Sequence, residues 1–236
     1  MLPLRDHLPT RSWAGVNYLL IAINVAVFGL EVSGVIAPAA GGTRLPGALV
    51  PARLVADPAG NAATLITHMF LHGGLAHIAG NMLFLWIFGD NVEDALGHVR
   101  YLLFYLLCGI AGALAQVAGD PHSHVPMIGA SGAISGVLAA YLILYPRSPI
   151  TVVNPIPILW LFWGLFLWFP AWFVILEWFA VNLWSALQPS SRAGGVAFMA
   201  HVGGFIAGLV LSPLLRTRER VAHDRWSRLA RARRSE

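Results

Sequence analysis

Six long apolar runs, each bounded by charged residues, prolines or glycine pairs, constrain this chain more than any other feature of its sequence. A helix that crosses the hydrocarbon core of a bilayer needs about 20 apolar residues. Only 11% of the residues are charged, compared with about 25% in an ordinary soluble domain. We therefore predict an all-α integral membrane protein, a bundle of six transmembrane helices, without a separate soluble domain. The predicted spans lie at 16–36, 74–89, 99–118, 128–145, within 151–187, and at 198–215.

The positions of the arginines set the expected topology. The C-terminal tail carries eight of them, and the N-terminal flank carries Arg5 and Arg11. Positively charged segments stay on the cytoplasmic side of a membrane, so both termini are expected there and the number of spans must be even. Residues 151–187 are long enough for two short spans, but a seventh span would place the basic tail outside. We therefore expect one span there, starting near Pro170 after a Trp-rich connector over 151–169 at the interface.

This topology divides the chain into a cytoplasmic N-terminal segment over 1–15, a membrane domain over 16–215 and a basic cytoplasmic tail over 216–236. Because the tail directly follows a span, we expect it to contact anionic lipid headgroups rather than nucleic acid. All fifteen basic residues are arginine, which we take to favour a bacterial protein in the cell membrane. No oligomeric state follows from the sequence.

Four polar residues from three predicted spans should meet near the outer side of the membrane. His77 and Asn81 are four residues apart, on one face at the outer end of the second span. Ser131 lies about one turn inside the fourth span, which enters from outside, and His201 lies just inside the outer end of the sixth. Polar side chains are costly in a bilayer, so this convergence indicates a functional site.

These residue types suit nucleophilic catalysis. A serine is a weak nucleophile until a neighbouring base takes its proton, and neutral imidazole is such a base near pH 7. His201 is therefore the candidate base for Ser131. Asn81, His77 and the backbone N–H of Ser131 are suitable donors for the oxyanion of a tetrahedral intermediate. The water that completes such a reaction needs a polar cavity, and His72, Asn81 and His201 are candidates to line it.

Non-catalytic alternatives fit the same residues. Small residues at four-residue spacing are common where membrane helices pack, and we assign Gly204 and Gly208 to packing. A scaffold that binds transmembrane helices, or a small channel, would use Ser131 in the same way. Cys108, the only cysteine, is expected to pack in the core. Glu177 in the fifth span either lines a watery cavity or finds a partner within the bundle.

A metal-dependent membrane hydrolase is the second alternative, because imidazole is the commonest metal ligand. It would use His68, His72 and His77. No glutamate stands between His68 and His72, as the helix of a zinc protease requires. We therefore expect no metal and no other cofactor.

Four sequence blocks resemble the rhomboid family of intramembrane serine proteases. They are HGGLAHIAGN in the second span, FGDNVEDALGH after it, GASGAISG in the fourth span and AHVGGFIAG in the sixth. The resemblance implies a Ser131–His201 dyad that hydrolyses peptide bonds in or beside the transmembrane segments of other membrane proteins. It also implies that Asn81 and His77 form an oxyanion hole with the Ser131 N–H, and that Gly129 lies along the substrate-binding edge.

The resemblance has further implications for the helices around the dyad. Gly204 and Gly208 would let the sixth helix approach the fourth, and the fifth span with its connector would resemble a lateral gate for substrate. Some members support the histidine ring with a tyrosine four residues after the nucleophile. That position is Ser135 here, a candidate hydrogen-bond donor instead. A Trp-Arg pair that many members carry in the first outer loop is also missing before THMFLHGG, which bears on the stability of that loop.

Overall fold

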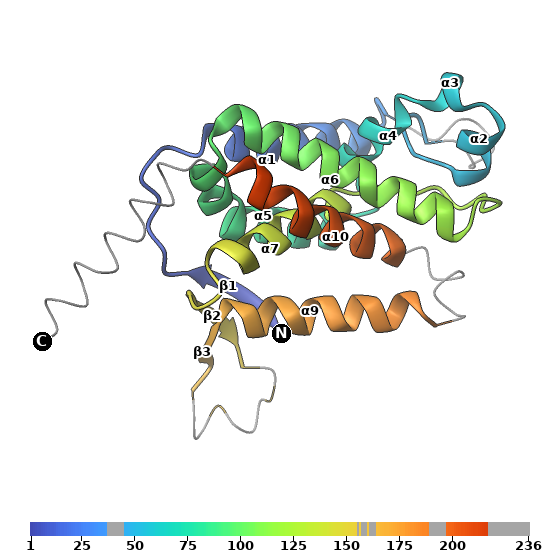
Figure 1. Ribbon diagram of the computed structural model, residues 1–236. Coiled ribbons are helices and arrows are strands. Elements are labelled where there is room, and N and C mark those ends of the chain that lie inside the picture. The colour runs from blue at the N-terminus through green and yellow to red at the C-terminus, as the bar shows by residue number, and fades with distance from the viewer. Residues whose placement is uncertain (37–44, 155, 157–159, 161–163, 189–196, 217–236) are drawn as a thin grey trace, which may run out of the picture.

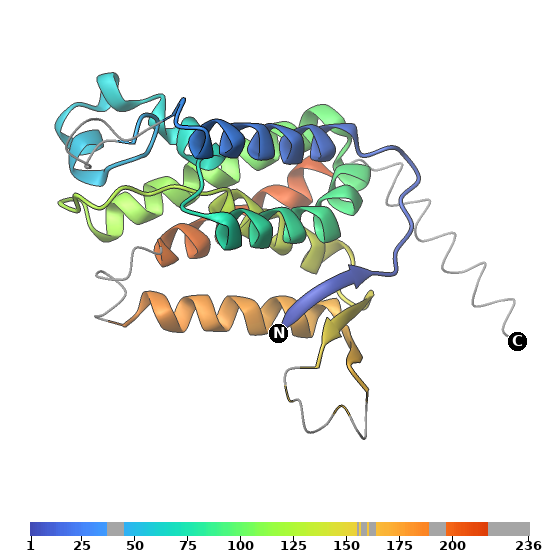
Figure 2. The ribbon, with the colours of Figure 1, turned by 180° about the vertical axis from the view of Figure 1, so that it is seen from behind.

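The computed structural model describes residues 1–36, 45–154, 156, 160, 164–188 and 197–216. It is mostly helical, with a small antiparallel sheet at one end of the helix bundle and several short helices at the other (Figures 1 and 2). The long helices are α1 (Gly15–Val32), α5 (Leu75–Leu96), α6 (His98–Gly119), α7 (Ser131–Leu144), α9 (Ala171–Ala186) and α10 (Phe198–Leu215). The short helices are α2 (Pro51–Ala56), α3 (Pro58–Asn61), α4 (Thr64–Thr67) and η1 (His68–Phe70).

Long helices occupy all six apolar runs of the sequence. Three of them, α1, α6 and α10, are long and apolar enough to cross a membrane. A fourth candidate is α5 together with the short helices that precede it, which meet α5 at a bend of 80°. α7 and α9 are apolar but shorter. The chain is therefore a multi-pass membrane protein, as the apolar runs predict.

α7 lies at the centre of the bundle and packs against α5, α6, α9 and α10 (Figure 2). Every residue from Gly132 to Tyr141 is buried. A Cβ added at Gly136 would lie 2.4 Å from Sγ of Cys108 on α6, and one added at Gly208 would lie 2.4 Å from the carbonyl oxygen of Gly136. The small residues of α7 therefore let α6 and α10 pack directly against its backbone.

The structure also contains a sheet that the all-α prediction missed. Strands β1 (Leu2–Asp6), β2 (Pro149–Val153) and β3 (Phe166–Pro170) pair in that order, antiparallel throughout. Branched residues such as those of β2 suit strands, but the partner strand β1 is far away in the sequence, so no local pattern indicates the pairing. Near the sheet, both carboxylate oxygens of Glu177 on α9 lie 3.1 Å from the amino group of Met1, which gives this side chain a partner.

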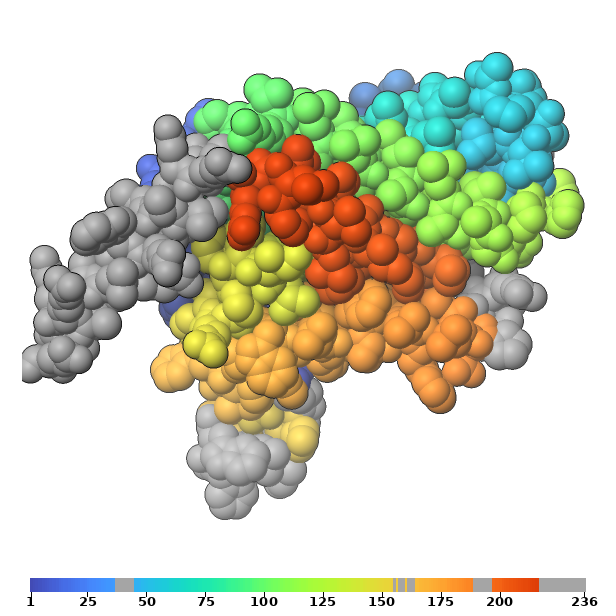
Figure 3. All heavy atoms as spheres, viewed as in Figure 1, coloured from blue at the N-terminus to red at the C-terminus, as the bar shows by residue number. Residues whose placement is uncertain are grey.

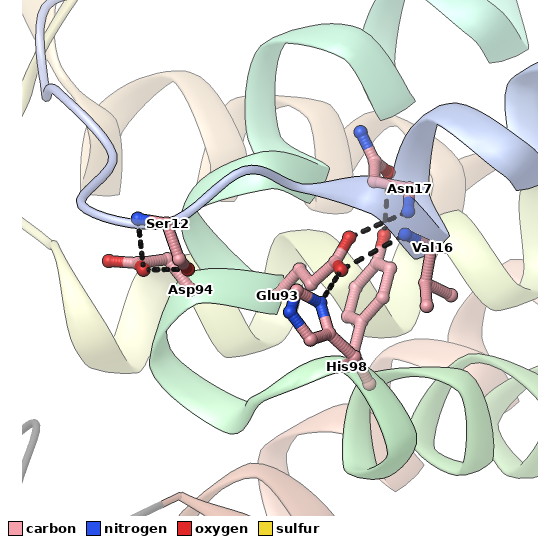
Figure 4. A network of polar contacts seen from close by, with 7 residues as sticks. Ser12, Val16, Asn17, Glu93, Asp94 and His98 are labelled. Atoms are coloured by element: carbon pink, nitrogen blue, oxygen red, sulfur yellow. Dashed lines mark hydrogen bonds and ion pairs between the residues drawn. The ribbon is translucent and has the colours of Figure 1, made fainter.

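α5 continues past the predicted end of the second span to Leu96, and its last turns contact the segment at the start of α1 (Figure 4). The buried Glu93 carboxylate accepts hydrogen bonds from the backbone N–H groups of Val16 (3.0 Å) and Asn17 (2.6 Å). Asp94 accepts hydrogen bonds from the N–H (3.1 Å) and hydroxyl (2.5 Å) of Ser12. α1 has no side-chain cap from its own N-cap residue, so Glu93 satisfies the unpaired N–H groups at its N-terminus.

Candidate active site

Ser131 is the first residue of α7, whereas the sequence predicts it about one turn inside the span. The segment before it is not helical. Met127 pairs with Leu49 through backbone hydrogen bonds of 2.7 and 3.1 Å, and Gly129 has a φ of +119°, which few residues other than glycine adopt. The first N–H groups of a helix have no acceptor within that helix. The backbone N–H of Ser131 is therefore in a suitable position for an oxyanion donor.

His201 reaches Ser131 from the first turn of α10. Its Nε2 lies 2.7 Å from Oγ of Ser131. The two helices touch backbone to backbone close to this pair, since a Cβ added at Gly204 would lie 1.9 Å from the carbonyl oxygen of Gly132. His201 is only 8% exposed, whereas Ser131 is half-buried at the cavity. A hydroxyl and an imidazole in this arrangement can exchange a proton.

Side chains of α9 contact the ring of His201. Oδ1 of Asn182 lies 2.5 Å from Nδ1 of His201, and the centroids of the Trp178 and His201 rings are 5.7 Å apart. The hydroxyl of Ser135 donates to the carbonyl oxygen of Ser131 at 2.6 Å and so is not directed at His201. Neither Asn182 nor Trp178 was predicted as a site residue. The available signal was an asparagine four residues after a tryptophan in an apolar run.

The predicted oxyanion and substrate residues share one cavity with Ser131 and His201. This cavity has a volume of about 610 Å³, and His77, Asn81 and Gly129 are among its lining residues. A Cβ added at Gly129 would lie 2.7 Å from Nε2 of His77, so the glycine leaves open space beside that ring. The structure thus brings five predicted site residues together, from α5, α7, α10 and the segment before α7.

The histidines of the metal-hydrolase alternative are placed differently. His72 does not line the cavity: its Nε2 accepts a hydrogen bond from Asn81 (3.0 Å), and its backbone N–H bonds to Glu31 (3.1 Å). Nδ1 of His68 bonds to the carbonyl oxygen of Thr64 at 2.7 Å. Within the described residues, no three His, Cys, Asp or Glu side chains are placed to hold a metal ion. His68 and His72 therefore bond to neighbouring segments of the chain around the cavity.

A family model described as "Rhomboid domain" matches residues 59–218, which confirms the resemblance found in the four sequence blocks. "Rhomboid protein 1, mitochondrial" of Saccharomyces cerevisiae is 30% identical over 221 residues, which cover 88% of this chain and 56% of that protein. "Rhomboid protease GluP" of Bacillus subtilis is 47% identical over 78 residues, which cover 33% of this chain and 15% of that protein.

A further relative bears on the question of activity. "Inactive rhomboid protein 1" of Drosophila melanogaster is 34% identical over 80 residues, which cover 34% of this chain and 6% of that protein. The chain spans at most 56% of the length of these three relatives. Similarity alone therefore assigns the chain to a group that contains both proteases and inactive proteins.

Proposed function

Because this chain belongs to the rhomboid family, we propose that it is an intramembrane serine endopeptidase that cleaves transmembrane segments of other membrane proteins. One observation carries the proposal: Nε2 of His201 lies 2.7 Å from Oγ of Ser131, inside a cavity of the helix bundle. A nucleophile within hydrogen-bond reach of a base is the arrangement that covalent catalysis requires. A protein in which Ser131 served only helix packing would need neither the histidine contact nor the cavity.

The chemistry follows from this contact. Oγ of Ser131 attacks the carbonyl carbon of the scissile peptide bond while Nε2 of His201 takes the hydroxyl proton. When the tetrahedral intermediate collapses, the C–N bond breaks, the proton passes to the leaving amine, and an acyl ester remains on Ser131. Water then attacks the ester, with His201 taking its proton and returning it to Oγ as the carboxylic acid leaves.

His77 and Asn81 supply donors for the oxyanion together with the Ser131 N–H. The backbone N–H of Gly73 donates to Nδ1 of His77 at 3.3 Å, so the proton of the neutral ring is on Nε2, the atom beside Gly129. An amide nitrogen carries two hydrogens, so Asn81 keeps a donor after its bond to His72. Developing negative charge in the cavity therefore meets donors that are already in place.

The topology is part of the proposal. We assign six spans, both termini in the cytoplasm, the active site toward the extracytoplasmic side, and the cell membrane as the location. β1 precedes α1 and β2 follows α7, and the pairing of these strands supports an even number of crossings between them. Residues 217–236 of the basic tail, which we expect to contact lipid headgroups, lie outside the described residues.

Cleavage of a reconstituted substrate tests the proposal. The purified protein is incorporated into liposomes with a fluorogenic peptide that contains one transmembrane segment, and product is followed with time. We expect cleavage by the wild type and by Ser212→Ala, a buried serine on α10 that does not line the cavity. We expect none by Ser131→Ala or His201→Ala.

Two other results would overturn the proposal. Folded wild-type protein that retains the peptide without cutting it would favour a scaffold that binds transmembrane helices. Cleavage that survives Ser131→Ala but is lost with a chelator would favour the metal-dependent alternative.

A further inference from the structure

The Ser131–His201 pair has a third polar neighbour, and it is not a carboxylate. Asn182, 8% exposed and about one turn before the C-terminal end of the apolar helix α9, directs Oδ1 at Nδ1 of His201 at 2.5 Å. A polar side chain inside a membrane helix is costly unless it is bonded, and this one is bonded on both sides. Its amide nitrogen donates to the carbonyl oxygen of Trp178, one turn earlier, at 2.8 Å.

These two bonds fix which nitrogen of His201 carries the proton. The carbonyl oxygen of Trp178 can only accept, so the NH2 group of Asn182 must face it and the amide oxygen must face His201. An amide oxygen can only accept as well, so Nδ1 of His201 must be the protonated nitrogen. Nε2 is then left with its lone pair toward the hydroxyl of Ser131, which is the form that a general base needs.

α9 also places the ring of His201. The ring of Trp178 is tilted by 41° against it at a centroid distance of 5.7 Å. Trp178 and Asn182 are four residues apart and so lie on one face of α9. Ser135, four residues after Ser131, does not direct its hydroxyl at the His201 ring, because that hydroxyl donates to the carbonyl oxygen of Ser131.

We propose that Asn182 is a positioning residue, which holds His201 in the tautomer and orientation that activate Ser131. The inference rests on the proposed function, because it concerns the same pair. It follows that His201 keeps this tautomer and orientation only while α9 is packed against α10. The two helices lie side by side (Figure 3), and the rings of Phe179 and Phe205 stack between them at 4.2 Å.

The test separates the rate of reaction from the amount of folded protein. Wild type and variants in detergent are treated with an excess of a fluorophosphonate probe, and both the rate constant and the final fraction labelled are measured. Asn182→Leu removes the acceptor at nearly constant volume. We expect the full fraction to react, about 100-fold more slowly, since general-base catalysis contributes 10²–10⁴-fold. In peptide cleavage, kcat should fall by a similar factor while KM changes less than about twofold.

Asn24→Leu is the matched control. Asn24 is fully buried in α1 and donates its amide nitrogen to the carbonyl oxygen four residues earlier at 2.8 Å, as Asn182 does, but it does not line the cavity. We expect this variant to label at the wild-type rate. Asn182→Asp keeps an acceptor toward Nδ1 and should recover the rate to within about tenfold of wild type.

The outcomes are distinct. A wild-type rate in Asn182→Leu would overturn the inference, and so would a smaller labelled fraction that reacts at the wild-type rate, because that indicates only a role in folding. Equal slowing in Asn24→Leu would overturn it too. In each of these cases labelling of the wild type at Ser131 leaves the proposed function standing. Absence of label on the folded wild type would instead overturn the proposed function itself.

Discussion

A methyl group at Gly204 should separate Ser131 from His201 without altering either residue. Gly204 lies three residues after His201 on α10, and Gly132 directly follows Ser131 on α7. A Cβ at Gly204 would lie 1.9 Å from the carbonyl oxygen of Gly132 and 3.3 Å from its Cα. Both atoms belong to the helix backbone, so no side chain can rotate away to relieve the clash. Gly204→Ala must therefore move one helix relative to the other.

The size of this movement follows from the contact distance. Ordinary contact of a Cβ begins near 3.4 Å, so the helices must separate by about 1.5 Å. The same movement would lengthen the 2.7 Å contact between Ser131 and His201 to about 4 Å, beyond hydrogen-bond range. A misplacement of about 1 Å can cost 10²-fold in rate. Overpacking of a close contact also costs about 1–3 kcal/mol of stability.

The assay is again the rate constant of fluorophosphonate labelling, measured with the thermal denaturation midpoint in detergent. We expect Gly204→Ala to label at least about 100-fold more slowly than wild type. Gly29→Ala is the control, because a Cβ at this position of α1 meets no atom within 4 Å. This variant should label at the wild-type rate. If Gly204→Ala reacts within threefold of wild type, the backbone contact does not hold the pair together and the reasoning is wrong.

Three further changes test other parts of the structure. Gly129→Ala would place a Cβ 2.7 Å from Nε2 of His77 at a φ of +119°, so kcat/KM for a transmembrane peptide should fall by at least about tenfold. Glu93→Ala leaves two N–H groups of α1 without their acceptor, and denaturant titration should show a loss of about 2–4 kcal/mol. Burial raises the pKa of Asp6 in β1 above its ordinary value of 3.8. The folded protein therefore binds this proton more tightly than the unfolded chain. The resulting contribution to the free energy of unfolding is fully present below pH 3.8 and is lost as the pH rises through the folded-state pKa. The difference in thermal denaturation midpoint between Asp6→Asn and wild type should therefore shift in favour of the variant as the pH rises from 4 to 7. An equal difference at both pH values would contradict this account.

The helices could be predicted from the sequence, and so could the clustering of Ser131, His201 and the two oxyanion candidates at one depth, because each depends on a local pattern. Apolar length locates the spans, and α10 begins and ends at the residues expected for the sixth. The depth of Ser131, His77 and Asn81 follows from their distance to the nearest loop. Two glycines before Leu75 indicated the break at the start of α5.

The remaining features depend on contacts between distant segments. The sheet joins β1 to β2 across four long helices, α1, α5, α6 and α7, and the short helices between them, and no periodicity in either strand indicates its partner. α7 begins later than expected because the pairing of Met127 with Leu49 keeps the preceding residues out of the helix. The role proposed for Asn182 depends on how α9 packs against α10, which the sequence of one helix does not specify.

The most direct test of the central claim is to find which residue of the folded protein a fluorophosphonate modifies. Purified protein in detergent is labelled, digested and analysed by mass spectrometry, alongside Ser131→Ala and His201→Ala. The account predicts one adduct on the wild type, at Ser131, and none at that position in either variant. An unlabelled wild type that is folded and cleaves no transmembrane peptide, or an adduct on a different residue, would contradict it.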